Sequence, residues 1–189
     1  MKYKMPIFII EHLEKRIYKW CLIEYKHISK IVGKNNLWFT NTKSKELKKY
    51  GKVFEKSVSE LNLKKACILD PDAKKVLNTK DVKKFNYFIF GGILGDYPRK
   101  KRTKSELTKK LNFENRNIGK KQLSTDNAVY VAKEILNGKS LNKIKFKDKI
   151  EIELGKYDSV ILPYRYAIVN KKPLISNELI TYLKRRKGF

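Results

Sequence analysis

Apolar residues fall into short, uninterrupted runs along the first half of the chain. Four of these runs are bounded by polar or turn-forming residues: Ile7–Ile10, Leu37–Phe39, Ala66–Leu69 and Tyr87–Phe90. An apolar run of this length is typical of a strand that is buried on both faces. We therefore expect these segments to be strands of a mostly parallel sheet.

Between and after these runs, apolar residues recur at helical spacing. The spacing predicts one helix from Leu13 to Val32 and another that starts after Ser124 or Thr125 as its N-cap and ends at Leu136. Shorter helical segments are expected at Ser57–Leu63, Thr79–Lys84, Thr103–Leu111 and Asn177–Arg186. This alternation of strands and helices favours an α/β fold with helices on both faces of the sheet.

After Leu136 the hydrophobic period changes to two. Apolar residues alternate with polar ones at Ile144, Phe146, Ile150, Ile152, Leu154, Val160 and Leu162. Such alternation predicts half-exposed antiparallel strands near the C-terminus, which we expect at an edge of the main sheet. The chain has no internal repeat and no long Gly/Pro/Ser linker, so residues 1–189 are expected to form one domain.

The composition adds a strong positive charge. The 189 residues include 45 Lys and Arg against 19 Asp and Glu, a formal net charge of +26. This charge favours an anionic partner such as RNA, although lysine is spread along the whole chain and a general lysine bias explains the charge equally well. The densest basic cluster, Arg99–Lys104, is more informative because it follows a glycine-rich segment.

Several classes of protein are excluded. No apolar run approaches the roughly 20 residues of a membrane span, and the run after the basic start Met1–Lys4 is too short for a signal peptide. We therefore expect a cytoplasmic protein. The two cysteines exclude a disulfide-rich scaffold and a four-cysteine zinc site, and with two histidines no metal site is expected.

The glycine-rich segment Gly91–Asp96 directly follows a predicted strand. Glycines let the backbone approach a ligand closely or reach positive φ, and ligands of α/β sheets bind at the carboxyl ends of strands. The segment does not fit the dinucleotide fingerprint, because a basic run follows it instead of a helix. A tight turn without a ligand is the alternative, but apolar Ile93 and Leu94 between the glycines indicate the walls of a pocket.

Three weaker features accompany this segment. The polar loop Arg116–Asp126 leads into a helix N-terminus, which favours an anionic or electron-rich group. Pro163 stands at a strand boundary beside Tyr164 and Arg165, which plain packing also explains. Glu11 and His12 end the first predicted strand, where a solvated strand end is the alternative to a functional pair.

The run Phe90–Asp96, with Arg102-Thr103 shortly after it, resembles a group of SPOUT-class methyltransferases. This group is labelled as predicted RNA methyltransferases and includes an arginine methyltransferase that acts on a small-subunit ribosomal protein. Four further segments fit in order: Ile9–His12 with Trp20 and Glu24-Tyr25, Leu69–Pro71, Lys121–Ala128 and Pro163–Tyr166. The resemblance covers nearly the whole chain, apart from Lys43–Lys56 and the tail after Arg185.

The resemblance implies a fold, a cofactor and its site. The implied fold is an α/β fold with a C-terminal trefoil knot. The implied cofactor is S-adenosylmethionine, which becomes S-adenosylhomocysteine when its methyl group is transferred. No metal is implied. The implied cofactor-binding residues are Phe90, Gly91, Gly92, Ile93, Leu94, Gly95, Asp96, Ile118, Gly119, Gln122, Leu123, Ser124, Thr125, Leu162, Pro163, Tyr164 and Arg165. The residues themselves are consistent with one pocket of backbone amides and apolar walls around an adenine.

The group that accepts the methyl group determines which side chains are needed for catalysis. A guanidinium stays charged in solution, so carboxylates must hold it and help to remove a proton. The candidates are Glu11, Glu24, Asp70 and Asp96, with His12 as a proton relay. Substrate or RNA docking is expected at Trp20, Arg99, Lys100, Lys101, Arg102 and Lys104.

We expect an enzyme that methylates an arginine of a ribosomal protein. The alternative is an rRNA or tRNA methyltransferase of the SPOUT class, and a more distant one is a non-catalytic RNA-binding or ribosome-assembly protein. Acids and loops sufficient for one site lie within one chain, so a monomer is expected, with a homodimer as the alternative.

Overall fold

A parallel sheet forms the centre of the computed structural model, which describes residues 5–186, so the basic start at residues 1–4 lies outside the described residues. Within that range its six strands have the order β3-β2-β1-β5-β4-β6. They span Ile7–His12 (β1), Leu37–Thr40 (β2), Lys52–Val53 (β3), Ala66–Leu69 (β4), Tyr87–Gly92 (β5) and Glu114–Arg116 (β6). The four predicted strands are confirmed. The short edge strands β3 and β6 were missed because they are too polar to form an apolar run.

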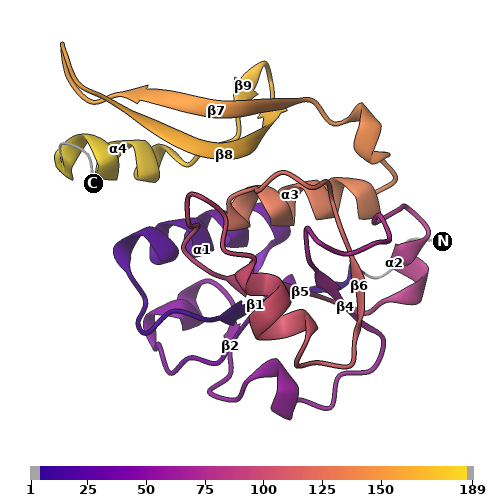
Figure 1. Cartoon of the computed structure of the whole chain (residues 1–189). Helices are drawn as coiled ribbons and strands as arrows, with labels where there is room; N and C mark the ends of the chain where they lie inside the picture. The colour runs from indigo at the N-terminus through magenta and orange to yellow at the C-terminus, as the bar shows by residue number, and fades with distance from the viewer. Residues whose placement is uncertain (1–4, 187–189) are drawn as a thin grey trace.

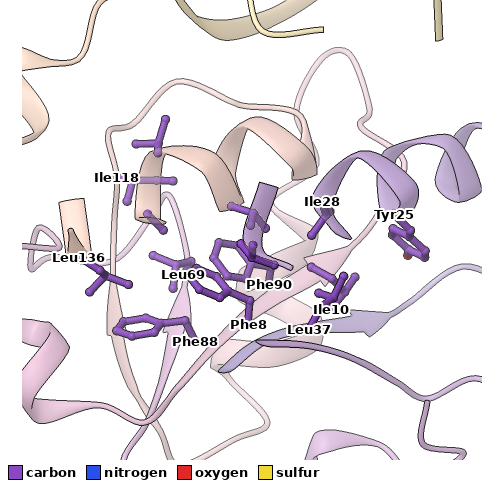
Figure 2. Close-up of a cluster of buried hydrophobic side chains, with 14 of the residues drawn as sticks. Phe8, Ile10, Tyr25, Ile28, Leu37, Leu69, Phe88, Phe90, Ile118 and Leu136 are labelled. Atoms are coloured by element: carbon purple, nitrogen blue, oxygen red, sulfur yellow. The ribbon is translucent and has the colours of Figure 1, made fainter. Parts of the chain in front are cut away.

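The two long helices cover one face of this sheet (Figure 1). They are α1 (Lys19–Val32) and α3 (Thr125–Leu136). Figure 2 shows Phe8, Phe88 and Phe90 of the sheet in the same buried cluster as Ile28 of α1. Burial of these large side chains is the main stabilising contribution of this layer, at about 25 cal/mol per Å² of apolar surface.

Short helical turns, instead of long helices, cover the opposite face. Ile9, Ile68 and Ile89 pack there against Val58 of η3 (Val58–Glu60) and Leu107 of a π-helical turn, η4 (Lys104–Thr108). Alternate residues of each strand thus face opposite layers, which explains why the strands are apolar throughout. The remaining short helices are η1 (Lys34–Asn36), η2 (Glu46–Lys49), α2 (Asp81–Lys84) and η5 (Leu141–Lys143).

The first helix begins later than its spacing predicts. The backbone N–H of Leu13 donates to the carbonyl of Gly92 at 3.1 Å, so the chain continues along β5 beyond the end of β1. Tyr18 is still extended, and α1 starts at Lys19. The predicted helix Thr103–Leu111 is likewise reduced to the five-residue turn η4.

The last third of the chain forms a separate layer (Figure 1). Strands β7 (Phe146–Glu153), β8 (Ser159–Val169) and β9 (Lys172–Pro173) form an antiparallel sheet of their own, followed by α4 (Asn177–Arg186). The expectation that these strands extend an edge of the main sheet is therefore wrong. Asn127 of α3 holds the layer instead: its side-chain carbonyl accepts from the backbone N–H of Ala167 at 2.8 Å.

One further observation bears on the predicted architecture. Among residues 5–186, no helix combines the length and the apolar character needed to cross a membrane. The trefoil knot that the resemblance implies stays a prediction.

Candidate active site

A cavity of about 370 Å³ lies at the carboxyl ends of β4 and β5. Its volume falls within the roughly 300–1,000 Å³ of small-molecule sites. Most of the predicted site residues line it: Trp20, Glu24, Asp70, Phe90, Gly91, Ile93, Leu94, Gly95, Asp96, Arg99, Lys100, Lys101, Arg102, Ile118, Gly119, Gln122, Leu123, Ser124, Thr125 and Tyr164. The others lie outside its lining: Glu11, His12, Gly92, Lys104, Leu162, Pro163 and Arg165.

The glycines of the Gly91–Asp96 segment are needed because neighbouring atoms pack closely against them. None of them has a positive φ angle. Gly91 and Gly92 are the last residues of β5, and among the described glycines positive φ occurs at Gly33, Gly119 and Gly138. A Cβ atom on Gly92 would collide with the Tyr25 hydroxyl, and one on Gly95 would lie 2.7 Å from the Tyr164 ring. Neighbouring aromatic side chains therefore approach the end of β5 and the residues after it closely.

Tyr164 and Arg165 hold the cavity wall in different ways. The Tyr164 hydroxyl donates to the carbonyl of Gly95 at 2.7 Å and its ring lines the cavity. Arg165 supports the wall from behind: its backbone N–H donates to the carbonyl of Gln122 at 2.8 Å, and its Nε donates to Asp148 at 2.7 Å. The β8 segment thus fixes both the glycine-rich segment and the loop that precedes α3.

Glu24 is a buried acid of this cavity whose pKa is shifted upward. Trp20, one turn earlier on α1, donates its indole N–H to Glu24 Oε1 at 2.9 Å, and both residues line the cavity. Burial raises the pKa of Glu24 to about 8, and the negative charge of Asp126 adds to the rise. The carboxyl group is thus mostly protonated at neutral pH, and an approaching cation would favour its ionised form.

Asp126 belongs to the contact between α1 and α3. Its Oδ2 lies 2.7 Å from Nδ1 of His27, and its Oδ1 accepts from the Ser124 hydroxyl at 2.6 Å. Ser124 is the N-cap residue, as predicted, but its side chain makes no capping hydrogen bond because it is turned toward Asp126. This network fixes the start of α3 beside Glu24.

The two predicted aspartates have other partners. Asp70 Oδ1 accepts from the backbone N–H of Asp72 at 2.8 Å, and its Oδ2 accepts from the Thr108 hydroxyl at 2.6 Å. These bonds attach the η4 turn to the end of β4. Asp96 pairs with Lys100 at 3.1 Å. Both aspartates line the cavity, but each already serves a protein contact.

Glu11 and His12 lie in a buried network away from the cavity lining. Glu11 accepts hydrogen bonds from the Ser57 hydroxyl at 2.6 Å and the Val58 backbone N–H at 3.1 Å, and also from the Thr40 hydroxyl. His12 Nδ1 lies 2.9 Å from the Tyr25 hydroxyl, and burial lowers the pKa of its imidazole. Both residues lie outside the cavity lining, and their catalytic roles stay a prediction. These partners are distant in sequence, so the pattern could not reveal them.

Several of the predicted docking cations are engaged within the protein. Arg102 donates to Glu14 at 2.6 Å and to Glu106 at 2.7 Å, and Glu14 also accepts from the backbone N–H of Leu94 at 2.9 Å. Arg99 pairs with Asp72 at 2.8 Å. Arg102 therefore stabilises the glycine-rich segment through Glu14, which both Arg102 and Leu94 contact. Glu14, its partner, was missed because no motif marks it.

The ends of α1 and α4 supply further lining residues that the sequence pattern did not single out. They are Tyr18, Lys19, Tyr182 and Arg186. The spacing of Tyr182 and Arg186, four residues apart on a predicted helix, was the available signal that they share a helix face. In residues 5–186 no group of three or more His, Cys, Asp or Glu side chains is arranged to hold a metal ion.

Comparison with known proteins places this geometry in a family. A family model described as "Protein arginine N-methyltransferase SFM1-like" matches residues 7–188. The chain belongs to this family. The match to the SFM1-like family confirms the resemblance to SPOUT-class methyltransferases.

Individual members and neighbours agree with the assignment to the SFM1-like family. Protein arginine N-methyltransferase SFM1 of Saccharomyces cerevisiae is 31% identical over 201 residues, which cover 94% of each chain. The crystal structure of yeast SFM1 complexed with SAM has a TM-score of 0.89 and 30% identity, covering 97% of this chain and 92% of that one. Dual specific Trm10 from Thermococcus kodakaraensis shares the fold alone, with a TM-score of 0.56 and 22% identity, covering 73% of this chain and 96% of that one.

Proposed function

We propose that this chain transfers a methyl group from S-adenosylmethionine to a guanidinium nitrogen of an arginine in a ribosomal protein. One observation carries the proposal: the buried carboxyl group of Glu24, with its raised pKa, lines the same cavity as the glycine-rich segment implied to bind the cofactor. The yeast relative is an arginine methyltransferase whose structure was solved with SAM and with SAH.

The cavity suits such a cofactor. Ile93, Leu94, Ile118 and Leu123 supply apolar walls of the kind an adenine requires, and the volume of about 370 Å³ matches a small-molecule site. Gly119 is open: a Cβ atom there would meet no atom within 4 Å. When bound, the cofactor supplies an electrophilic methyl group on a sulfonium sulfur. The trefoil knot is part of the same proposal.

The acceptor chemistry is assigned to Glu24. A guanidinium has a pKa above about 12, so its nitrogen must lose a proton as the new N–C bond forms and the C–S bond breaks. A general base works best when its pKa lies near the operating pH, and Glu24 has a pKa of about 8. Trp20 orients the carboxylate through its indole N–H, and the proton passes from the guanidinium nitrogen to Glu24.

RNA is the second candidate acceptor, and the basic mouth of the cavity favours it. Lys19 and Lys101 line the cavity and are exposed, where they can meet phosphates. The deciding experiment is transfer of a labelled methyl group to ribosomes of the source organism, followed by separation of RNA and protein. Label in protein supports the proposal, and label in RNA replaces it with the second candidate. Intact S-adenosylhomocysteine binding without transfer to either would leave a non-catalytic binding protein.

The proposal extends to the state of the protein. We propose one domain that acts as a monomer in the cytoplasm. The acids and loops of this chain are sufficient to line one cavity. Sedimentation at micromolar concentration tests the monomer, and a stable dimer would contradict it.

A further inference from the structure

The C-terminal helix α4 is fixed beside the first turns of α1. Leu179 and Leu183 are 3% and 1% exposed and belong to the same apolar cluster as Ile23 of α1. Lys26 of α1 donates to Glu178 of α4 at 2.9 Å. Figure 1 shows α4 on the side of the molecule where α1 lies. The helix α4 is thus held in place by apolar packing along its length and by an ion pair in its first turn.

This docking brings α4 to the cavity. Tyr182 and Arg186 line it together with Trp20 and Glu24. Tyr182 and Trp20 are partly buried and pack against the same apolar cluster. An aromatic ring from the last helix and a carboxyl group from the first therefore face one space.

Two aromatic rings of this wall, those of Tyr18 and Tyr182, each have an arginine guanidinium near the ring face. The Arg186 guanidinium lies 5.5 Å from the centre of the Tyr182 ring, and its Nη1 donates to the Tyr182 hydroxyl at 2.7 Å. Tyr18, which also lines the cavity, carries the Arg16 guanidinium at 4.9 Å. The face of an aromatic ring attracts a cation, and a planar guanidinium also stacks on it. The cavity wall is thus suited to arginine.

We propose that Tyr182 and Glu24 form the acceptor subsite. In this subsite the guanidinium of a substrate arginine stacks on the Tyr182 ring and lies next to the Glu24 carboxyl group. Without substrate, the Arg186 guanidinium covers the face of the Tyr182 ring, and the substrate arginine displaces it. This inference rests on the proposed arginine methylation, and it adds residues of α4 to the proposed active site. An ammonium group lacks the planar shape for this stacking, so the subsite selects arginine over lysine.

Binding of a small arginine probe tests the subsite directly. The chain has two tryptophans, so Trp38→Phe leaves Trp20 as the single fluorescent reporter beside Glu24. N-acetyl-arginine amide is titrated against N-acetyl-citrulline amide, which has the same shape without the charge. We expect a saturable change in Trp20 emission with the arginine amide and none with the citrulline amide.

Variants of α4 make the test specific. In the same background Tyr182→Leu should weaken binding about fivefold, the effect of one cation–π contact. Arg186→Gln should tighten binding, because it removes the resident cation and lies at an exposed position where folding is not at risk. Tyr157→Leu, 87% exposed between β7 and β8, is the matched control and should leave binding unchanged.

Two outcomes overturn the inference. One is an equal response to both amides, and the other is unchanged arginine binding in both Tyr182→Leu and Arg186→Gln. Calorimetry with S-adenosylhomocysteine separates this failure from that of the proposed function. A chain that binds S-adenosylhomocysteine without binding the arginine amide loses only the subsite, whereas a chain that binds neither loses the proposed function as well.

Discussion

Two buried glutamates, Glu11 at the end of β1 and Glu24 on α1, have nearly the same exposure but different surroundings. Glu11 is 2% exposed and accepts hydrogen bonds from Thr40, Ser57 and Val58. Glu24 is 7% exposed, lines the cavity and feels the negative charge of Asp126. Burial alone therefore does not identify a functional acid. A carboxylate held by donors away from the cavity stabilises the fold, whereas one that lines the cavity with a raised pKa is available for chemistry.

Replacement of Glu24 tests this difference most strongly. Glu24→Gln keeps the shape of the side chain but removes the proton acceptor, so we expect turnover to fall by about 100-fold or more. The measurement is labelled-methyl transfer at saturating substrate, with S-adenosylhomocysteine binding checked by calorimetry. Glu153→Gln, on the exposed side of β7, is the matched control. Wild-type turnover in Glu24→Gln would remove Glu24 from the mechanism.

Replacement of Glu11 should have the opposite effect. Glu11→Gln presents an N–H group to donors that need an acceptor, and leaving buried donors unsatisfied costs about 1–3 kcal/mol. We expect the free energy of unfolding in urea to fall by that amount, while turnover per folded molecule stays at the wild-type level. A loss of turnover at unchanged stability would contradict the comparison and restore a catalytic role for Glu11.

The sequence predicted the sheet better than the surroundings of the acids. The apolar runs identified the four central strands because both faces of those strands are buried, and the resemblance located the loops that line the cavity. The partners of Glu11 could not be predicted, because Thr40, Ser57 and Val58 reach it only through tertiary packing. The same holds for Tyr182, which reaches the cavity through the docking of α4 on α1.

The pH dependence of stability tests the raised pKa of Glu24. Folding raises the pKa of Glu24 from about 4.5 to about 8, so between these values the folded state binds more protons than the unfolded state. Stability due to this group is complete below about pH 4.5 and is lost as the pH rises to about 8, by at most about 1.4 kcal/mol per pH unit. Thermal unfolding across pH 5–8 should show a shallower fall for Glu24→Gln than for the wild type. Parallel curves would contradict the raised pKa.

The smallest effect is expected from Trp20, which tunes Glu24 without accepting a proton itself. The indole N–H stabilises the ionised carboxylate and so lowers the pKa of Glu24 against the effect of burial. Trp20→Phe keeps an aromatic ring but loses this hydrogen bond, which contributes about 1 kcal/mol. The pH at which activity is half-maximal should therefore rise by less than about one pH unit, so that turnover falls about fivefold at pH 7 and recovers near pH 9. A uniform loss across the whole pH–rate profile would instead assign Trp20 to substrate binding and leave the pKa of Glu24 to burial, Asp126 and the hydrogen bonds from Thr125.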